Sequence, residues 1–134
     1  MSIRGMKNKI VKDVLISKDK TLIVFVCTTG NYAFQTEGDC CSHSWIEHLS
    51  GIRTLKSKKP IERVTDIAMP PAESCNDYDV IKTYGVQFDI AGKGHFTIEY
   101  RNSSNGYYGG SIEFCNGGIS DKTMSELTSV KKDF

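Results

Sequence analysis

The alternation of hydrophobic and polar positions is clearest in the second half of the chain. Residues 84–90 alternate apolar side chains with polar residues or glycine, and residues 96–101 do the same after a glycine-rich turn at 91–94. A period of two is typical of a strand with one buried face, so these segments predict a β-hairpin. A further apolar alternation over 111–115 extends the prediction to a three-stranded antiparallel meander.

The first half of the chain also reads mainly as strands. Residues 14–16 predict a first strand, and residues 21–27 are almost continuously apolar and rich in β-branched side chains. Such a run is typical of a central strand covered on both faces. A turn at 28–31 then predicts a hairpin onto a strand at 32–36. Weaker strand patterns follow at 52–55 and 61–69.

Residues 38–49 predict the principal helix of the chain. Trp45, Ile46 and Leu49 fall at i, i+1 and i+4, which places them on one narrow helical face. We expect Trp45 to anchor this helix in the core. The predicted capping residues are Ser42 or Ser44 at its start and Gly51 at its end.

Together these elements predict an α+β fold, with a mostly antiparallel sheet of six to eight strands and one principal helix packed on it. The 134 residues are enough for a single domain, 1–134. The tail, 117–134, has Met124, Leu127 and Val130 at a weakly amphipathic spacing. It predicts a short helix, a lid or a segment that docks on a partner.

Charge and hydropathy exclude several classes of function. Seventeen Lys and Arg residues oppose sixteen Asp and Glu, so the broad basic field of a duplex nucleic-acid binder is not expected. The longest apolar run, 22–27, is far too short to cross a membrane, and the first residues lack a signal-peptide pattern. Five cysteines without disulfide-scaffold spacing fit a reducing compartment. We therefore expect a cytoplasmic protein.

The segment 101–110, with the sequence RNSSNGYYGG, has the composition of a polar and aromatic ligand site. Arg101 could pair with phosphate, Tyr107 or Tyr108 could stack on a base, and Asn102 or Asn105 could read polar edges. The alternative is a plain hairpin connection in which Asn105 and Gly106 form the turn. The predicted ligand-binding residues are Arg101, Asn102, Ser104, Asn105, Tyr107, Tyr108, Asp39 and Ser42.

A second group of reactive side chains precedes the predicted helix. Cys40, Cys41 and His43 could form a thiol-based catalytic set for a hydrolase or transferase. Vicinal cysteines reach one tetrahedral ion poorly, so neither a metal site nor a cofactor is predicted. The structural alternative is that one cysteine is a small buried apolar residue.

Two motifs carry a resemblance to a known family. The sequence GDCCS at 38–42, followed by Trp45 and Ile46, combines with the segment 101–110. Residues 10–115 thereby resemble small proteins of unassigned function that are encoded by bacteriophages and prophages. The resemblance implies a phage context, in which small non-enzymatic proteins sequester nucleotide signals of bacterial immunity.

The leading hypothesis is therefore a non-enzymatic anti-defence protein in the cytosol of a bacterial host. It would hold a small anionic ligand, a nucleotide of the cyclic ADP-ribose or cyclic oligonucleotide type. We expect a homodimer in which the interface or the tail closes the pocket. The alternatives are the cysteine- and histidine-dependent hydrolase or transferase, and a protein that inhibits a host factor by direct contact.

Overall fold

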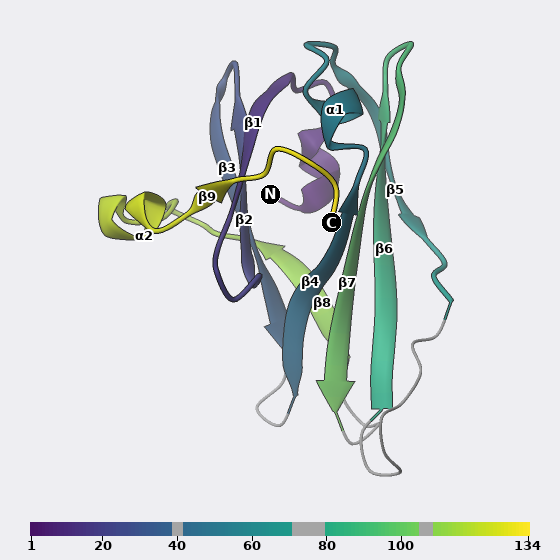
Figure 1. Cartoon of the computed structure of the whole chain (residues 1–134), viewed down its shortest axis with the longest axis vertical. Coiled ribbons are helices and arrows are strands. Elements are labelled where there is room, and N and C mark those ends of the chain that lie inside the picture. The colour runs from purple at the N-terminus through teal and green to yellow at the C-terminus, as the bar shows by residue number, and fades with distance from the viewer. Residues whose placement is uncertain (39–41, 71–79, 105–108) are drawn as a thin grey trace.

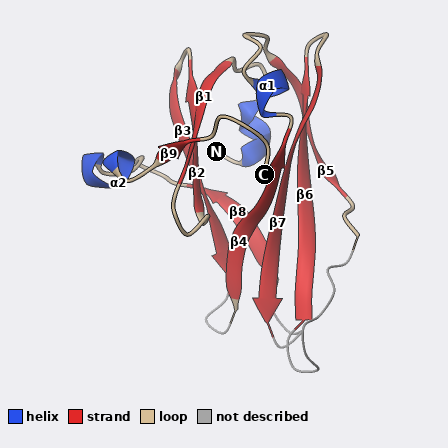
Figure 2. Cartoon of the chain, viewed as in Figure 1, coloured by secondary structure: helices blue, strands red, loops and turns tan. Residues whose placement is uncertain are grey.

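The computed structural model describes residues 1–38, 42–70, 80–104 and 109–134. These residues form two antiparallel sheets that face each other (Figures 1 and 2). The five-stranded sheet has the order β8-β3-β2-β1-β9, and the four-stranded sheet has the order β4-β7-β6-β5. The elements are η1 (Ile3–Met6), β1 (Val11–Ile16), β2 (Leu22–Cys27), β3 (Gly30–Gly38), β4 (His43–Ser50), α1 (Ile52–Leu55), β5 (Ile61–Ile67), β6 (Val80–Ile90), β7 (Gly94–Ser104), β8 (Gly110–Phe114), α2 (Asp121–Ser125) and β9 (Thr128–Ser129).

Strand β2 is covered on both faces, as its continuous apolar run predicts. Ile23 and Phe25 point into the main core between the sheets, and Leu22 and Val24 point to a second cluster on the other face. Phe25 is the centre of the main core. Its ring centroid lies 6.0 Å from that of Phe34 in the same sheet. The rings of Phe88 and Phe96 in the facing sheet lie 5.6 and 6.3 Å away.

The predicted hairpin is confirmed as β6 and β7, which pair in register from Val80 opposite Ser104 to Ile90 opposite Gly94. The predicted meander is wrong at its third strand. β8 pairs with β3, so that Gly38 lies opposite Gly110, and it belongs to the five-stranded sheet. The intervening residues thus carry the chain from one sheet to the other.

The α+β prediction is wrong, because the described chain is mostly β and none of its described helices exceeds five residues. The expected principal helix is strand β4, paired with β7. A β-bulge between Ile46 and His48 shifts the alternation by one residue, so Ile46 and Leu49 both face the core. The extra residue of the bulge lets Ile46 and Leu49, three positions apart, face the same side of a strand, and this spacing resembles that of a helix.

Three further predictions near this strand are wrong. Trp45 is only half-buried and lies on the outer face of the four-stranded sheet, opposite Arg101, so it does not anchor the core. Residues 52–55 form the short helix α1 rather than a strand. Gly51, expected to end a helix, joins the end of β4 to the start of α1.

The tail joins open edges of both sheets. Residues 128–134, which we call the C-terminal strap, begin in β9 against β1 and continue to β4 (Figure 1). The main chain of Phe134 exchanges two hydrogen bonds with Leu49, of 3.0 and 3.1 Å. Val130 is buried in the main core, whereas Met124 and Leu127 pack on the second cluster. The strap therefore fastens the two sheets together.

Two carboxylates hold the strap, and we expect acid to loosen it. Burial tends to raise the pKa of Asp13, but hydrogen bonds from Ser129 and Lys56 outweigh it and lower that pKa. Main-chain N–H groups of Gly51 and Ile52 likewise lower the pKa of Asp133. Each group therefore stabilises the fold above its unfolded pKa of about 4, and this contribution is lost as the pH falls through the folded pKa.

Urea unfolding of the wild type between roughly pH 6 and pH 2.5 should show stability falling steeply at the acidic end. Asp13→Asn should be less stable than the wild type at neutral pH, and its stability should fall less steeply with acid. Identical pH dependence of the two proteins would contradict this role of Asp13.

Candidate functional site

The two polar segments singled out in the sequence converge at one end of the molecule. β3 ends where Gly38 pairs with Gly110, and β4 starts where His43 and Ser44 lie opposite Ser103 and Asn102. The chain positions that flank 39–41 and 105–108 are therefore neighbours, as Figure 1 shows. Asp39, Cys40, Cys41, Asn105, Tyr107 and Tyr108 lie outside the described residues, so their predicted roles stay predictions.

Asn102 is the buried centre of this junction, with no exposed surface. Its side-chain Nδ2 donates to the hydroxyl of Ser44 at 2.8 Å and to that of Ser42 at 3.1 Å. Ser44 in turn donates to the carbonyl of Glu37 at 2.9 Å. The Asn102 Oδ1 atom is buried and accepts no hydrogen bond from the residues that the structure describes. Ser44, held by Asn102, therefore ties the four-stranded sheet to the end of β3.

Two glycines leave room for this polar junction. A Cβ atom on Gly38 would lie 2.5 Å from Ser42 Oγ and 3.0 Å from Asn102 Nδ2. A Cβ atom on Gly110 would lie 2.6 Å from Ser44 Oγ and 2.9 Å from Asn102 Cβ. Any side chain at either position would displace the hydrogen-bonded groups, so these glycines serve close packing.

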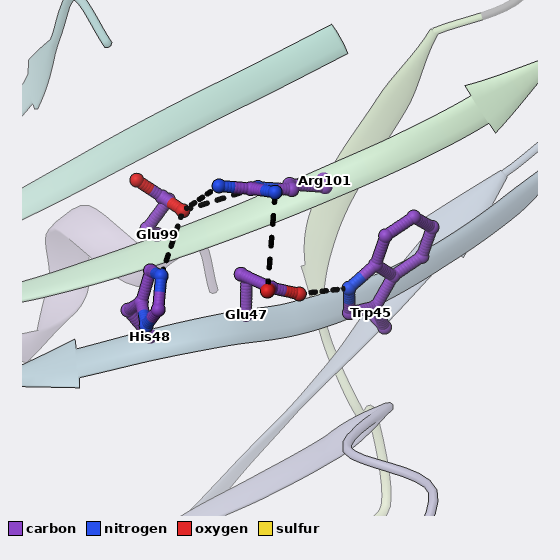
Figure 3. Close-up of polar contacts among 5 residues, drawn as sticks. All are labelled: Trp45, Glu47, His48, Glu99 and Arg101. Atoms are coloured by element: carbon purple, nitrogen blue, oxygen red, sulfur yellow. Dashed lines mark hydrogen bonds and ion pairs between the residues drawn. The ribbon is translucent and has the colours of Figure 1, made fainter. Parts of the chain in front are cut away.

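Arg101 and Asn102 lie on opposite faces of β7, because successive side chains of a strand alternate. Figure 3 shows Arg101 on the outer face of the four-stranded sheet, among polar side chains of β4 and β7. Its Nε donates to Glu99 Oε2 at 3.1 Å, and a second nitrogen lies 3.0 Å from the same oxygen. Glu47 Oε1 lies 3.8 Å from the guanidinium and also belongs to this cluster.

This outer cluster limits what Arg101 can bind. One guanidinium faces two carboxylates, and Trp45 Nε1 donates to Glu47 Oε2 at 2.6 Å (Figure 3). His48 Nε2 lies 3.8 Å from Glu99 Oε2. An incoming phosphate would therefore meet a site whose positive charge is already paired. The structure brings Asn102, Ser42 and Ser44 together but places Arg101 apart from them.

A cleft of about 500 Å³ lies beside the junction and is lined mainly by β5, β6 and the residues that follow β5. We call it the tyrosine cleft, because Tyr84 and Tyr100 form part of its wall with their rings stacked at 5.0 Å and 14°. The N–H of Gly110 donates to the Tyr84 hydroxyl at 3.2 Å. The described lining residues are Asp66, Ile67, Ala68, Met69, Thr83, Tyr84, Gly85, Tyr100 and Gly110.

The polar groups of the tyrosine cleft can accept and donate hydrogen bonds. Burial raises the pKa of Tyr100 to about 12, with a smaller contribution from Asp66, so its hydroxyl stays protonated. The Thr83 hydroxyl is not one of these groups, because it is buried on the other face of β6 from Tyr84, where Thr83 lies opposite Arg101. No described Lys or Arg lines the cleft. Lys82, two residues before Tyr84 on the same face of β6, is the cation adjacent to it in the strand.

The candidate residues named from the sequence do not include Tyr84 and Tyr100, which line the cleft, or the neighbouring Lys82. The signal that would have found them is the hairpin register, since the turn at 91–94 sets Tyr84 directly opposite Tyr100. No such local signal identifies Asp66 and Met69 as lining residues, because β5 reaches this cleft through a long-range pairing with β6.

Of the predicted thiol-based catalytic set, the structure describes His43 but not Cys40 or Cys41. His43 is exposed and stacks on Trp45 at 5.4 Å and 19°, on the outer face. Burial raises the pKa of Cys27 to about 11, and burial also raises that of Cys115. Among the described residues, no three His, Cys, Asp or Glu side chains are grouped to hold a metal ion. No helix in the described ranges has the length and apolarity to span a membrane.

Comparison with known proteins finds an uncharacterised viral relative and a family model that match this chain. It is 32% identical over 113 residues to "Uncharacterized protein L278" of Acanthamoeba polyphaga mimivirus, covering 81% of this chain and 87% of that protein. No solved structure matches it significantly. Residues 5–114 match the family described as a domain of unknown function, DUF7448. The chain therefore belongs to the DUF7448 family.

Proposed function

We propose that this protein is a non-enzymatic binding protein that takes up a small nucleotide ligand in the tyrosine cleft. The observation that carries the proposal is the position of the cleft beside Gly110, the last residue of the predicted binding segment. A volume of about 500 Å³ lies within the range of small-molecule sites. In a viral context, such a protein would sequester a cyclic ADP-ribose or cyclic oligonucleotide signal of host immunity.

The walls of the cleft suit the base of such a ligand. Tyr84 is half-buried and offers a ring beside the opening, and aromatic rings bind bases of any sequence by stacking. The Asp66 carboxylate, which lines the cleft, can hydrogen-bond the polar edge of a base. These groups bind without reacting, which is what sequestration requires.

We assign the phosphate of the proposed ligand to Lys82, and the charges of the described residues support this choice. The cleft lining itself has a carboxylate, Asp66, and no described cation, so a phosphate would be repelled from its floor. Lys82 lies on the same face of β6 as Tyr84 and forms no ion pair with a described carboxylate. Arg101, the residue suggested by the sequence, lies on the other face between Glu99 and Glu47.

The proposed homodimer would close the cleft by contact between two copies. The tail cannot be assigned that role from the described lining, because none of the residues around the cleft comes from 117–134. Sedimentation analysis with and without ligand would measure the oligomeric state.

Calorimetry with a panel of cyclic ADP-ribose isomers and cyclic oligonucleotides tests the proposal. We expect one class to bind, and we expect Tyr84→Ala to weaken that binding by about tenfold or more through lost stacking. Lys82→Gln should weaken it by roughly tenfold. Absence of binding across the panel would refute the nucleotide assignment.

Arg101→Gln is the control that separates the two faces of the sheet. It should change the affinity by less than about twofold, since Arg101 does not line the cleft, lies on the other face of β7 from Tyr100, and is paired with Glu99 and Glu47. Strong loss in Arg101→Gln without loss in Lys82→Gln would instead place the ligand on the outer face. Ligand recovered intact after denaturation supports sequestration, whereas recovery of an altered product would favour the cysteine-dependent enzyme.

A further inference from the structure

The C-terminal strap forms a second cleft at the opposite edge of the sheets from the tyrosine cleft. This cleft, which we call the strap cleft, has a volume of about 500 Å³. The strap runs from its pairing with β1 to its contact with β4 (Figure 1), and it lines the cleft together with Ile16 and Lys20. The residues used below are Ile16, Lys20, Val130, Lys131, Lys132 and Phe134, all of which line it.

The floor of the strap cleft is apolar and held in place by the fold. Ile16 and Val130 are 8% and 6% exposed and belong to the main core. Phe134 is half-buried, and Lys20 Nζ lies 4.2 Å from the centre of its ring. The main-chain bonds of Phe134 with Leu49 fix the strap beside β4. An apolar group entering the cleft would therefore contact pre-formed walls.

The rim of the strap cleft is positively charged. Lys20, Lys131 and Lys132 are exposed, and none forms an ion pair with a carboxylate in the described part of the chain. The one acidic residue of the lining, Asp133, accepts a hydrogen bond of 2.9 Å from the N–H of Ile52. Its charge is thus directed toward the start of α1.

An apolar floor beneath three unpaired lysines is complementary to a ligand with an alkyl chain and one anionic head. We propose that the strap cleft binds a medium-chain fatty acid, with the alkyl chain on Ile16, Val130 and Phe134 and the carboxylate near Lys131 and Lys132. The size of the cleft fits a single short amphiphile. This site shares no described residue with the tyrosine cleft and is independent of the proposed nucleotide function.

Calorimetric titration with sodium decanoate, kept below its critical micelle concentration, tests the site. We expect saturable binding with one molecule per chain. Octanoate and hexanoate should bind progressively more weakly, by roughly three- to fourfold for each methylene removed. Decanol, which has the same chain without the charge, should bind at least about tenfold more weakly than decanoate. Equal binding of decanol, or no saturable binding of decanoate, would overturn the proposal.

A matched pair of variants locates the site. Lys131→Gln combined with Lys132→Gln should weaken decanoate binding by about tenfold or more and reduce its salt dependence. Lys93→Gln combined with Lys122→Gln removes the same charge from exposed residues outside the cleft, and it should leave binding unchanged. Equal effects of the two pairs would mean that decanoate responds only to net charge, which would refute the assigned site.

Discussion

Replacing Phe25 with alanine should lower the free energy of unfolding by about 3–5 kcal/mol, the range found for fully buried phenylalanines. Phe25 has no exposed surface and contacts aromatic rings of both sheets. Its removal would therefore leave a cavity at the interface between the sheets and would also reduce the apolar surface buried on folding. Urea unfolding followed by circular dichroism would measure the change, with the denaturant slope checked for two-state behaviour.

Phe114→Ala is the control for this experiment. Phe114 is half-buried in β8 and packs on Phe34 with a centroid distance of 5.6 Å, at the edge of the core. We expect it to lose about 1–2 kcal/mol, because less apolar surface leaves the core. Similar losses in the two variants would mean that Phe25 does not join the sheets as the structure describes.

The elements that the sequence predicts correctly are those whose pattern is local. The hairpin of β6 and β7 has strict alternation on both sides of a glycine turn, so its register follows from the sequence. β2 has enough continuous apolar residues to indicate burial on both faces. In each case one segment contains the whole signal.

The errors arise where the signal is irregular or distant. The bulge in β4 places Ile46 and Leu49 three residues apart on one face, and this spacing is also that of a helix. The pairing of β8 with β3 joins residues that are 72 (Gly38 and Gly110) to 80 (Phe34 and Phe114) positions apart, and no local pattern distinguishes it from a meander. In each case a pattern set by tertiary packing was interpreted as a signal of local structure.

The candidate site shows the same division. Sequence reasoning identified the two polar segments, and the described residues at their ends do meet at Asn102 and Ser44. It placed Arg101 in the same group as Asn102, although alternation along a strand separates adjacent side chains. Treating 101–104 as strand rather than loop would have directed attention to the inward face, where Tyr100 and Tyr84 stack.

Replacing Gly51 with alanine should lower the free energy of unfolding by about 3 kcal/mol or more, because two penalties combine. Gly51 has a φ of +90°, in the left-handed region that side chains disfavour. A Cβ atom there would also overlap the main-chain carbonyl oxygen of His95 and lie 3.1 Å from Phe96 Cα. Since backbone atoms of β7 cannot yield as a flexible side chain could, the joint between β4 and α1 would have to shift. Thermal and urea unfolding would measure the loss.

Gly92→Ala separates the two penalties. Gly92 has a φ of +68°, also in the left-handed region, but its Cβ would have no described atom within 4 Å. It should cost only about 1 kcal/mol, the conformational penalty alone. The difference between the two losses then reports the overlap with β7. Gly51→Ala should loosen the strap as well, because the N–H of Gly51 helps to hold Asp133. Equal losses in the two variants would show that β4 and β7 do not approach at Gly51 as closely as described.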